Sequence, residues 1–221
     1  DNGNIYYFDP NTGQMQIGLL NDNGTYYYMR GKSDVGSEGS KVTTPGVYTT
    51  GYGKSYYVTN ENGVIYTSGT GRQEITHTDG KTYTYYLYDD YSLAKGATKI
   101  GDEIFYFVND GEEDLFGQPV GSLVTTVGFI RPTDGNVYYV YGTGKDTSAG
   151  GNSYEVGRLF DERISPEKWI GWLNLNVDGK KEYYFFDDLA VMQTGFVETY
   201  NGEEYRTYYL AKSSGTIKVN S

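Results

Sequence analysis

The sequence predicts an all-β fold, a solenoid of stacked short β-hairpin repeats with one short helical turn near residues 165–170. Three observations predict it: aromatic clusters recur along all 221 residues, glycine-containing turns separate them, and helical periodicity is nearly absent. The composition agrees, because 26 tyrosines and 31 glycines suit thin, turn-rich β-structure better than a helical core. We expect a single repeat domain over residues 1–221, and the glycine-rich stretch 142–152 is the candidate boundary of a weak subdivision.

The repeat is marked by adjacent aromatic residues. Tyr7 and Tyr27 lie 20 positions apart, as do Tyr86 and Tyr106, and the other intervals are longer. This spacing indicates a unit of about twenty residues with loop insertions in several copies. The eight aromatic clusters are Tyr6-Tyr7-Phe8, Tyr26-Tyr27-Tyr28, Tyr56-Tyr57, Tyr85-Tyr86, Phe105-Tyr106-Phe107, Tyr138-Tyr139, Tyr183-Tyr184-Phe185 and Tyr208-Tyr209.

Turn signals precede many of these clusters. Asn-Gly and Asp-Gly supply the positive φ angles of type I′ turns, so each such pair predicts a β-hairpin. A single hairpin leaves its apolar face in water, whereas stacked hairpins bury it against their neighbours. The five dipeptides are Asn23-Gly24, Asp79-Gly80, Asp134-Gly135, Asp178-Gly179 and Asn201-Gly202.

One segment carries helix signals. Ser165 is a good N-cap, Pro166 fits the first helical position and Glu167 suits the positive N-terminal end of a helix. These three residues predict the helical turn near 165–170.

Charge and composition exclude several classes of function. The net charge of −11 opposes binding to nucleic acid, whose phosphates require a basic surface. No run of 18 apolar residues is present, so we expect no membrane insertion. The absence of cysteine excludes disulfides, thiolate metal sites and a cysteine nucleophile. The chain has no signal peptide, and Asp1-Asn2-Gly3 is interpreted as the start of a segment cut from a longer chain.

No residue pattern predicts catalysis. His77 is the sole histidine and lies beside a turn, where we expect a surface residue; no nucleophile-elbow motif accompanies it. Paired acids lie in or near turns, where solvated carboxylates are common. The acidic loop 109–114 lacks the spacing of an EF-hand, and one histidine cannot build a zinc site. We therefore expect no enzyme activity, no cofactor and no metal site.

Two stretches resemble the cell-wall-binding repeats of Gram-positive bacteria, a family that includes choline-binding modules, glucan-binding repeats and clostridial toxin-type repeats. The residues that carry the resemblance are 6–18, YYFDPNTGQMQIG, and the run from Gly171-Trp172 through Tyr183-Tyr184-Phe185-Phe186 to Gly195-Phe196. The resemblance implies a hairpin solenoid that binds sugar or choline between successive hairpins and that performs no catalysis. It also implies a secreted or cell-surface protein.

The resemblance also implies which residues bind the ligand. In choline-binding members a cage forms from a Trp after the repeat glycine, a Trp that opens the aromatic strand, and a Tyr from the next unit. Here only Gly171-Trp172 keeps the first Trp, and Tyr183 stands at the strand-opening position. Because cation–π attraction is strongest with Trp, choline is a doubtful ligand and a neutral glycan is at least as good a candidate. The predicted ligand-binding residues are Trp172, Tyr183, Trp169, Tyr205 and Tyr208.

Two interpretations of these aromatics stay open. Trp169 and Trp172 form either a ligand platform or a cap packed over the last repeats. The first function hypothesis is therefore a non-catalytic cell-wall or carbohydrate-binding repeat module that binds polymer through aromatic shelves between hairpins. The alternative is a structural spacer or protein-interaction stalk with no small-molecule ligand.

Overall fold

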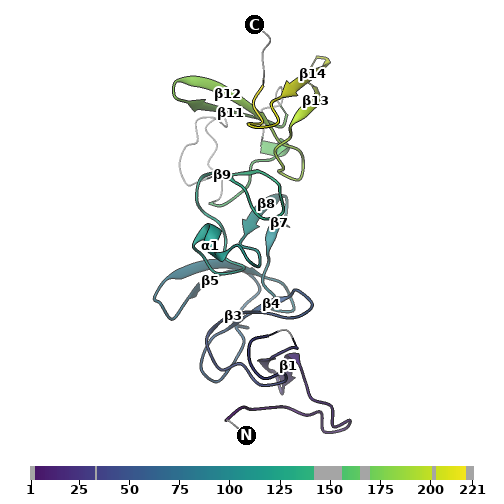
Figure 1. Cartoon of the computed structure of the whole chain (residues 1–221), viewed down its shortest axis with the longest axis vertical. Coiled ribbons are helices and arrows are strands. Elements are labelled where there is room, and N and C mark those ends of the chain that lie inside the picture. Colours follow the sequence, from purple (N-terminus) through teal and green to yellow (C-terminus); the bar gives the residue numbers. More distant parts are fainter. Residues whose placement is uncertain (1–2, 33, 142–155, 165–169, 201–202, 218–221) are drawn as a thin grey trace. The chain divides into compact units, whose positions relative to one another are not determined.

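The computed structural model describes residues 3–32, 34–141, 156–164, 170–200 and 203–217. Within these ranges the predicted all-β fold is confirmed: strands form seven two-stranded antiparallel hairpins, and helices are limited to α1 and a single 3₁₀ turn, η2 (Figure 1). The hairpins are β1 (Gly18–Asp22) with β2 (Thr25–Met29), β3 (Gly46–Thr49) with β4 (Ser55–Val58), β5 (Gly71–Thr76) with β6 (Thr82–Leu87), β7 (Gly96–Ile100) with β8 (Glu103–Phe107), β9 (Gly128–Ile130) with β10 (Tyr138–Val140), β11 (Trp172–Val177) with β12 (Lys180–Phe185), and β13 (Gly195–Tyr200) with β14 (Tyr205–Leu210).

The chain divides into two compact units. Unit 1 consists of residues 1–96 and 107–123, and unit 2 of residues 97–106 and 124–221. The stretch 142–152, the candidate boundary in the sequence, lies outside the described residues.

Within each unit, two adjacent linker residues join successive hairpins. In unit 2, the amide of Leu159 donates to the carbonyl of Ile104 on β8 at 2.7 Å, and the amide of Phe160 donates to Tyr139 on β10 at 2.9 Å. The linker therefore bonds to the second strands of two consecutive hairpins, which stacks one on the other and gives the predicted solenoid. Equivalent pairs of bonds are made by Ile65-Tyr66 and Leu93-Ala94 in unit 1, and by Met192-Gln193 in unit 2, where the acceptor of Met192 is Val137, directly before β10.

The turn predictions are confirmed at two positions and wrong at two others. Both central residues have positive φ at Asn23-Gly24 and at Asp178-Gly179, as a type I′ turn requires. At the other two dipeptides only Gly80 and Gly135 have positive φ. The reason is loop length, because residues 77–81 and 131–137 separate the paired strands there and a longer loop needs one left-handed residue rather than two. The dipeptide at 201–202 lies outside the described residues.

Two short helices accompany the hairpins. The predicted turn falls on residues 165–169, which lie outside the described residues, and η2 (Glu162–Ile164) comes just before them. The α-helix α1 (Glu113–Phe116) was not predicted. Acidic Glu113 and Asp114 occupy its first turn, which favours the helix dipole, and Gly117 ends it in a left-handed conformation with φ 63°.

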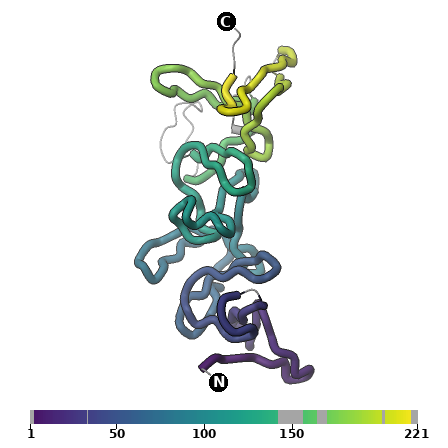
Figure 2. Tube along the Cα trace, in the orientation of Figure 1, coloured from purple at the N-terminus to yellow at the C-terminus, as the bar shows by residue number. Residues whose placement is uncertain are grey.

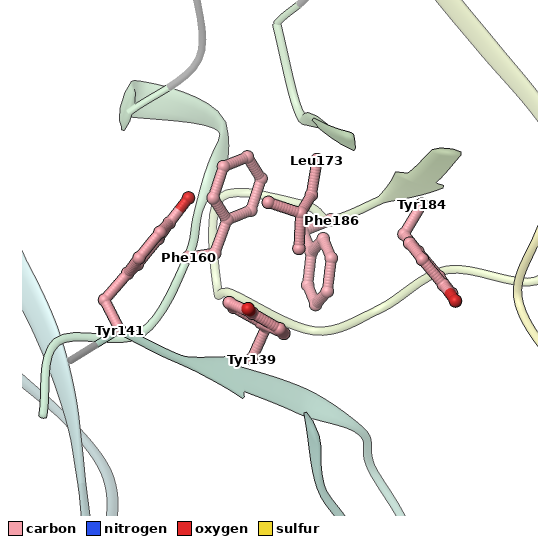
Figure 3. Packing of buried hydrophobic residues seen from close by; sticks show 6 residues of the cluster. All are labelled: Tyr139, Tyr141, Phe160, Leu173, Tyr184 and Phe186. Carbon is pink, nitrogen blue, oxygen red and sulfur yellow. The ribbon is translucent and has the colours of Figure 1, made fainter. Parts of the chain in front are cut away.

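The cores consist largely of aromatic side chains. In unit 2 one cluster joins Tyr139, Tyr141, Phe160, Leu173, Tyr184 and Phe186. Figure 3 shows Phe160, Leu173 and Tyr139 arranged around Phe186, with the Tyr184 ring beside them. In unit 1 one cluster lies around Tyr28 and Tyr56 and another around Tyr57 and Tyr85. In Figure 2 the Cα trace doubles back at the hairpins.

Candidate ligand site

The hairpin β11–β12 presents two different faces. Its register pairs Trp172 with Phe185 and Leu173 with Tyr184. Because successive side chains alternate between the faces of a strand, Leu173 and Tyr184 enter the core cluster and Trp172 and Phe185 occupy the opposite face. Tyr183 pairs with Asn174, and these residues lie two positions from Phe185 and Trp172 on their strands. Tyr183 therefore lies on the same face as Trp172.

Gly171 sets the position of Trp172. It has φ +81°, and a Cβ atom added there would lie 2.5 Å from the Phe185 ring and 2.7 Å from the carbonyl oxygen of Phe186. The backbone can pass this close to the second strand only without a side chain, which explains the Gly-Trp dipeptide.

The next hairpin brings Tyr208 onto Trp172. The two ring centroids lie 5.1 Å apart at an interplanar angle of 73°, and Phe185 packs edge-on against the same indole at 5.2 Å. The structure therefore brings together three of the predicted site residues, Trp172, Tyr183 and Tyr208, on the side of β11–β12 that faces away from the core cluster. Trp172 is only 6% exposed.

Tyr205 lies elsewhere. On β14, residues 205 and 208 differ by an odd number of positions and so point to opposite faces. Tyr205 pairs with Tyr200, and Phe196 pairs with Tyr209, both on the same face of β13–β14. We name these four residues, Phe196, Tyr200, Tyr205 and Tyr209, the aromatic face. Trp169 lies outside the described residues.

The aromatic face is open to solvent. Phe196 is 79% exposed and Tyr205 is 70% exposed, while Tyr200 and Tyr209 are 41% and 37% exposed. The rings form two pairs, Phe196 with Tyr209 at 5.0 Å and Tyr200 with Tyr205 at 5.2 Å. Glu198 and Thr207 pair with each other between them and place polar groups in the middle of the face.

Sequence reasoning missed three members of this face. Phe196, Tyr200 and Tyr209 were not among the predicted site residues, and the sequence indicates only which of them share a face, not that this face is exposed. Positions 196, 198 and 200 have the same parity, so an exposed Tyr200 implies an exposed Phe196 on the same face of the strand.

Tyr184 lies on the core face of β11–β12, on the same side as Glu182. Burial, and then the hydrogen bond that its hydroxyl donates to Glu182, raise the pKa of Tyr184 well above its usual value. The hydroxyl therefore stays protonated at neutral pH and holds the carboxylate of Glu182 next to β11–β12.

The described residues hold neither a membrane-spanning helix nor a metal-ligand cluster. No helix in them is both long and apolar enough to cross a membrane. They also contain no group of three or more His, Asp or Glu side chains arranged to bind a metal ion.

Comparisons with known proteins return solved structures only, since no family model and no curated protein sequence matches the chain. CbpJ from Streptococcus pneumoniae matches with a TM-score of 0.47 and 20% identity over 97% of this chain and 56% of that one. Choline binding protein F from Streptococcus pneumoniae, solved with a peptidoglycan analogue, gives 0.46 and 19% over 98% and 56%. The multimodular pneumococcal cell-wall endolysin of phage Cp-1, solved with choline, gives 0.28 and 17% over 70% and 38%.

The chain spans 56% of the length of the first two of these proteins. At 17–20% identity the matches concern the fold, a repeat of short β-hairpins. All three TM-scores lie below 0.5.

Proposed function

We propose that this chain is a non-catalytic module of a secreted or surface protein and that it binds a cell-wall polymer or another glycan. The observation that carries the proposal is the aromatic face of β13–β14, where four rings are exposed on one side of a single hairpin. Large exposed aromatic patches of this kind mark binding surfaces in soluble proteins.

The chemistry of the face suits sugar rings. Pyranose rings carry apolar C–H faces that lie against aromatic planes, and tyrosine hydroxyls can bond the sugar hydroxyls. Glu198 and Thr207 add acceptors and a donor between the two ring pairs. Phe196 and Tyr200 are four positions apart, a distance of about 13 Å along a strand, so the two pairs suit a chain of sugars better than a single one.

The same geometry favours a neutral glycan over choline. A quaternary ammonium needs accessible aromatic faces around it, with Trp the best of them. Trp172 is the one Trp after a repeat glycine, and Phe185 and Tyr208 already cover it. The glycan is therefore proposed to contact the aromatic face, while ligand binding at Trp172, Tyr183 and Tyr208 stays a prediction with its own test.

The aromatic face is tested by retention on insoluble polysaccharides and purified cell walls. Tyr205→Ala and Phe196→Ala should each weaken retention by about 1–3 kcal/mol, by analogy with stacking of bases on aromatic side chains. Tyr52→Ala is the matched control, because Tyr52 is 90% exposed but belongs to unit 1 and is not a member of the aromatic face. Equal retention of all three variants and the unchanged protein would reject the face as the binding surface.

Trp172→Ala separates the two interpretations of that residue. If Trp172 is a packed cap, the variant should lose about 3–5 kcal/mol of stability, the usual cost of removing a buried Trp. If it is a ligand shelf, retention should fall while the unfolding midpoint stays close to that of the unchanged protein. Its 6% exposure favours the first outcome.

The stalk hypothesis makes the opposite prediction for the whole chain. A spacer whose hairpins carry no ligand should show no retention on any cell-wall, glucan or choline matrix. Retention of the unchanged protein on one such matrix, and its loss in Tyr205→Ala, would exclude the stalk.

A further inference from the structure

A cavity of about 490 Å³ opens between successive hairpins of unit 2. Its apolar wall is formed by Ala97, Ile104, Leu189, Val191 and the ring of Tyr138. The Tyr138 hydroxyl is already engaged, since it donates to Asp134 at 2.8 Å and accepts from the Asn136 amide at 3.1 Å. Tyr138 therefore offers the cavity its ring and not a free polar group.

The cavity lies at the position in its repeat that Trp172, Tyr183 and Tyr208 occupy in a later repeat. Ala97 follows Gly96 as Trp172 follows Gly171. The carbonyl of Ile104 accepts from the linker residue Leu159, as the carbonyl of Tyr183 accepts from Ile217. The place of Tyr208 from the next hairpin is taken by Tyr138.

These equivalences explain why a cavity exists here. Where the later repeat has the indole of Trp172 and the ring of Tyr183, this repeat has a methyl group and an aliphatic chain. Less side-chain volume at the same backbone positions leaves open space. An aromatic cage for a quaternary ammonium cannot form around it, because only Tyr138 among the three equivalent positions is aromatic.

Charged groups of both signs line the cavity. Lys99 supplies a cation, and Glu162 and Asp188 supply carboxylates. Within the described ranges none of these three side chains makes a hydrogen bond or an ion pair. Arg163 also lines the cavity, but it is held by the fully buried Asp161 through Nε at 3.0 Å and Nη2 at 2.7 Å.

This charge arrangement defines the ligand. Asp161 also lies 4.0 Å from Arg158, which pairs with Glu103, so Arg158 and Arg163 are balanced by Asp161 and Glu103. The charged groups of the cavity left to bind a ligand are one ammonium, on Lys99, and two carboxylates, on Glu162 and Asp188. A ligand with a carboxylate for Lys99 and an ammonium for the two acids would satisfy both. The apolar wall would accommodate small aliphatic side chains, and the volume is within the usual range for small-molecule sites.

We propose that the cavity lined by Ala97, Ile104 and Tyr138 binds a small zwitterion, an amino acid or short peptide that carries both a free ammonium and a free carboxylate. This site is separate from the aromatic face and does not depend on glycan binding there.

Calorimetric titration with L-alanyl-L-alanine tests the proposal. The unmodified dipeptide should bind, and N-acetylation or C-terminal amidation should each weaken binding roughly tenfold or more, since each removes one charged hydrogen-bonding group. Lys99→Gln and Asp188→Asn should have the same effect, and Ala97→Phe should block the cavity. Because Lys99, Asp188 and Ala97 are exposed, these variants should fold.

Matched controls lie on the hairpin β11–β12 of the same unit. Lys180→Gln and Asp178→Asn remove equivalent charges at its turn, away from the cavity, and should bind the dipeptide as the unchanged protein does. Equal binding of the amidated and free dipeptides would show a cation site and overturn the proposal, as would the absence of dipeptide binding. Polymer retention of Lys99→Gln and Asp188→Asn should be unchanged, so a failure here is distinguishable from a failure of glycan binding.

Discussion

At the scale of single residues, His77 is more than the exposed turn residue that the sequence predicts. Its imidazole packs against Tyr57 at 4.7 Å and Tyr83 at 4.9 Å, and its Nε2 lies 2.7 Å from the Tyr85 hydroxyl. Burial lowers the pKa of His77 below its usual value, and the charge of Asp79 only partly offsets this. The folded protein therefore binds a proton at His77 less readily than the unfolded chain does.

The sign of the pH effect follows from this difference. Above the unfolded-state pKa of about 6.5 both states are neutral at His77, and stability is at its full value. As the pH falls from about 6.5 through the lower folded-state pKa, the unfolded chain binds the proton first and stability decreases. Urea unfolding between pH 8 and pH 5.5 should show this decrease in the unchanged protein and a flatter profile in His77→Gln. Parallel profiles for the two proteins would exclude His77 as the cause.

At the scale of structural elements, glycines determine how closely the hairpins approach their neighbours. Gly171 and Gly179 belong to the same hairpin and have nearly equal positive φ, +81° and +79°. An added Cβ would meet nothing within 4 Å at Gly179 but would clash with the Phe186 carbonyl at Gly171. Alanine at Gly179 therefore measures backbone strain alone, and alanine at Gly171 measures backbone strain together with the steric clash.

Alanine at each position should give different losses of stability. Gly179→Ala should cost about 1–2 kcal/mol, the penalty of a left-handed conformation for a residue with Cβ. Gly171→Ala should cost a further 1–3 kcal/mol, roughly the usual cost of overpacking, because backbone atoms cannot move aside. Thermal unfolding of the two variants measures both values. Equal losses would mean that the β11–β12 backbone relaxes around the added methyl group.

At the scale of the whole molecule, each unit has a core of its own. Val58 belongs to a cluster in unit 1 and Leu173 to the cluster in unit 2, and both are almost fully buried. In a repeat protein stability is approximately a sum of repeat and nearest-neighbour terms, so a change in one core should act locally. The two units should therefore respond separately to core substitutions.

Calorimetry of two variants tests this separation. Leu173→Ala should cost about 2–5 kcal/mol and lower the unfolding transition of unit 2, while Val58→Ala should lower that of unit 1. A single transition that both substitutions shift together would show that the chain unfolds as one cooperative body.

The sequence alone determined the repeat architecture. Adjacent aromatics, glycines with obligatory positive φ and the two-residue turns at Asn23-Gly24 and Asp178-Gly179 specify hairpins through local backbone preferences, and these predictions are confirmed. Tyr208 of the next hairpin packs on Trp172, and whether these residues bind a ligand stays a prediction.

Only the tertiary structure decided which aromatic rings are covered. Tyr205 and Tyr208 are three residues apart on one strand, yet one is 70% exposed and the other packs on the preceding hairpin. The two-residue period of a strand divides its side chains between two faces but does not say which face meets a neighbour. The cavity at Ala97 and Ile104 likewise could not be recognised from the sequence. The linker hydrogen bonds show which residues of different repeats are equivalent, whereas the inserted loops make the sequence spacing between repeats irregular.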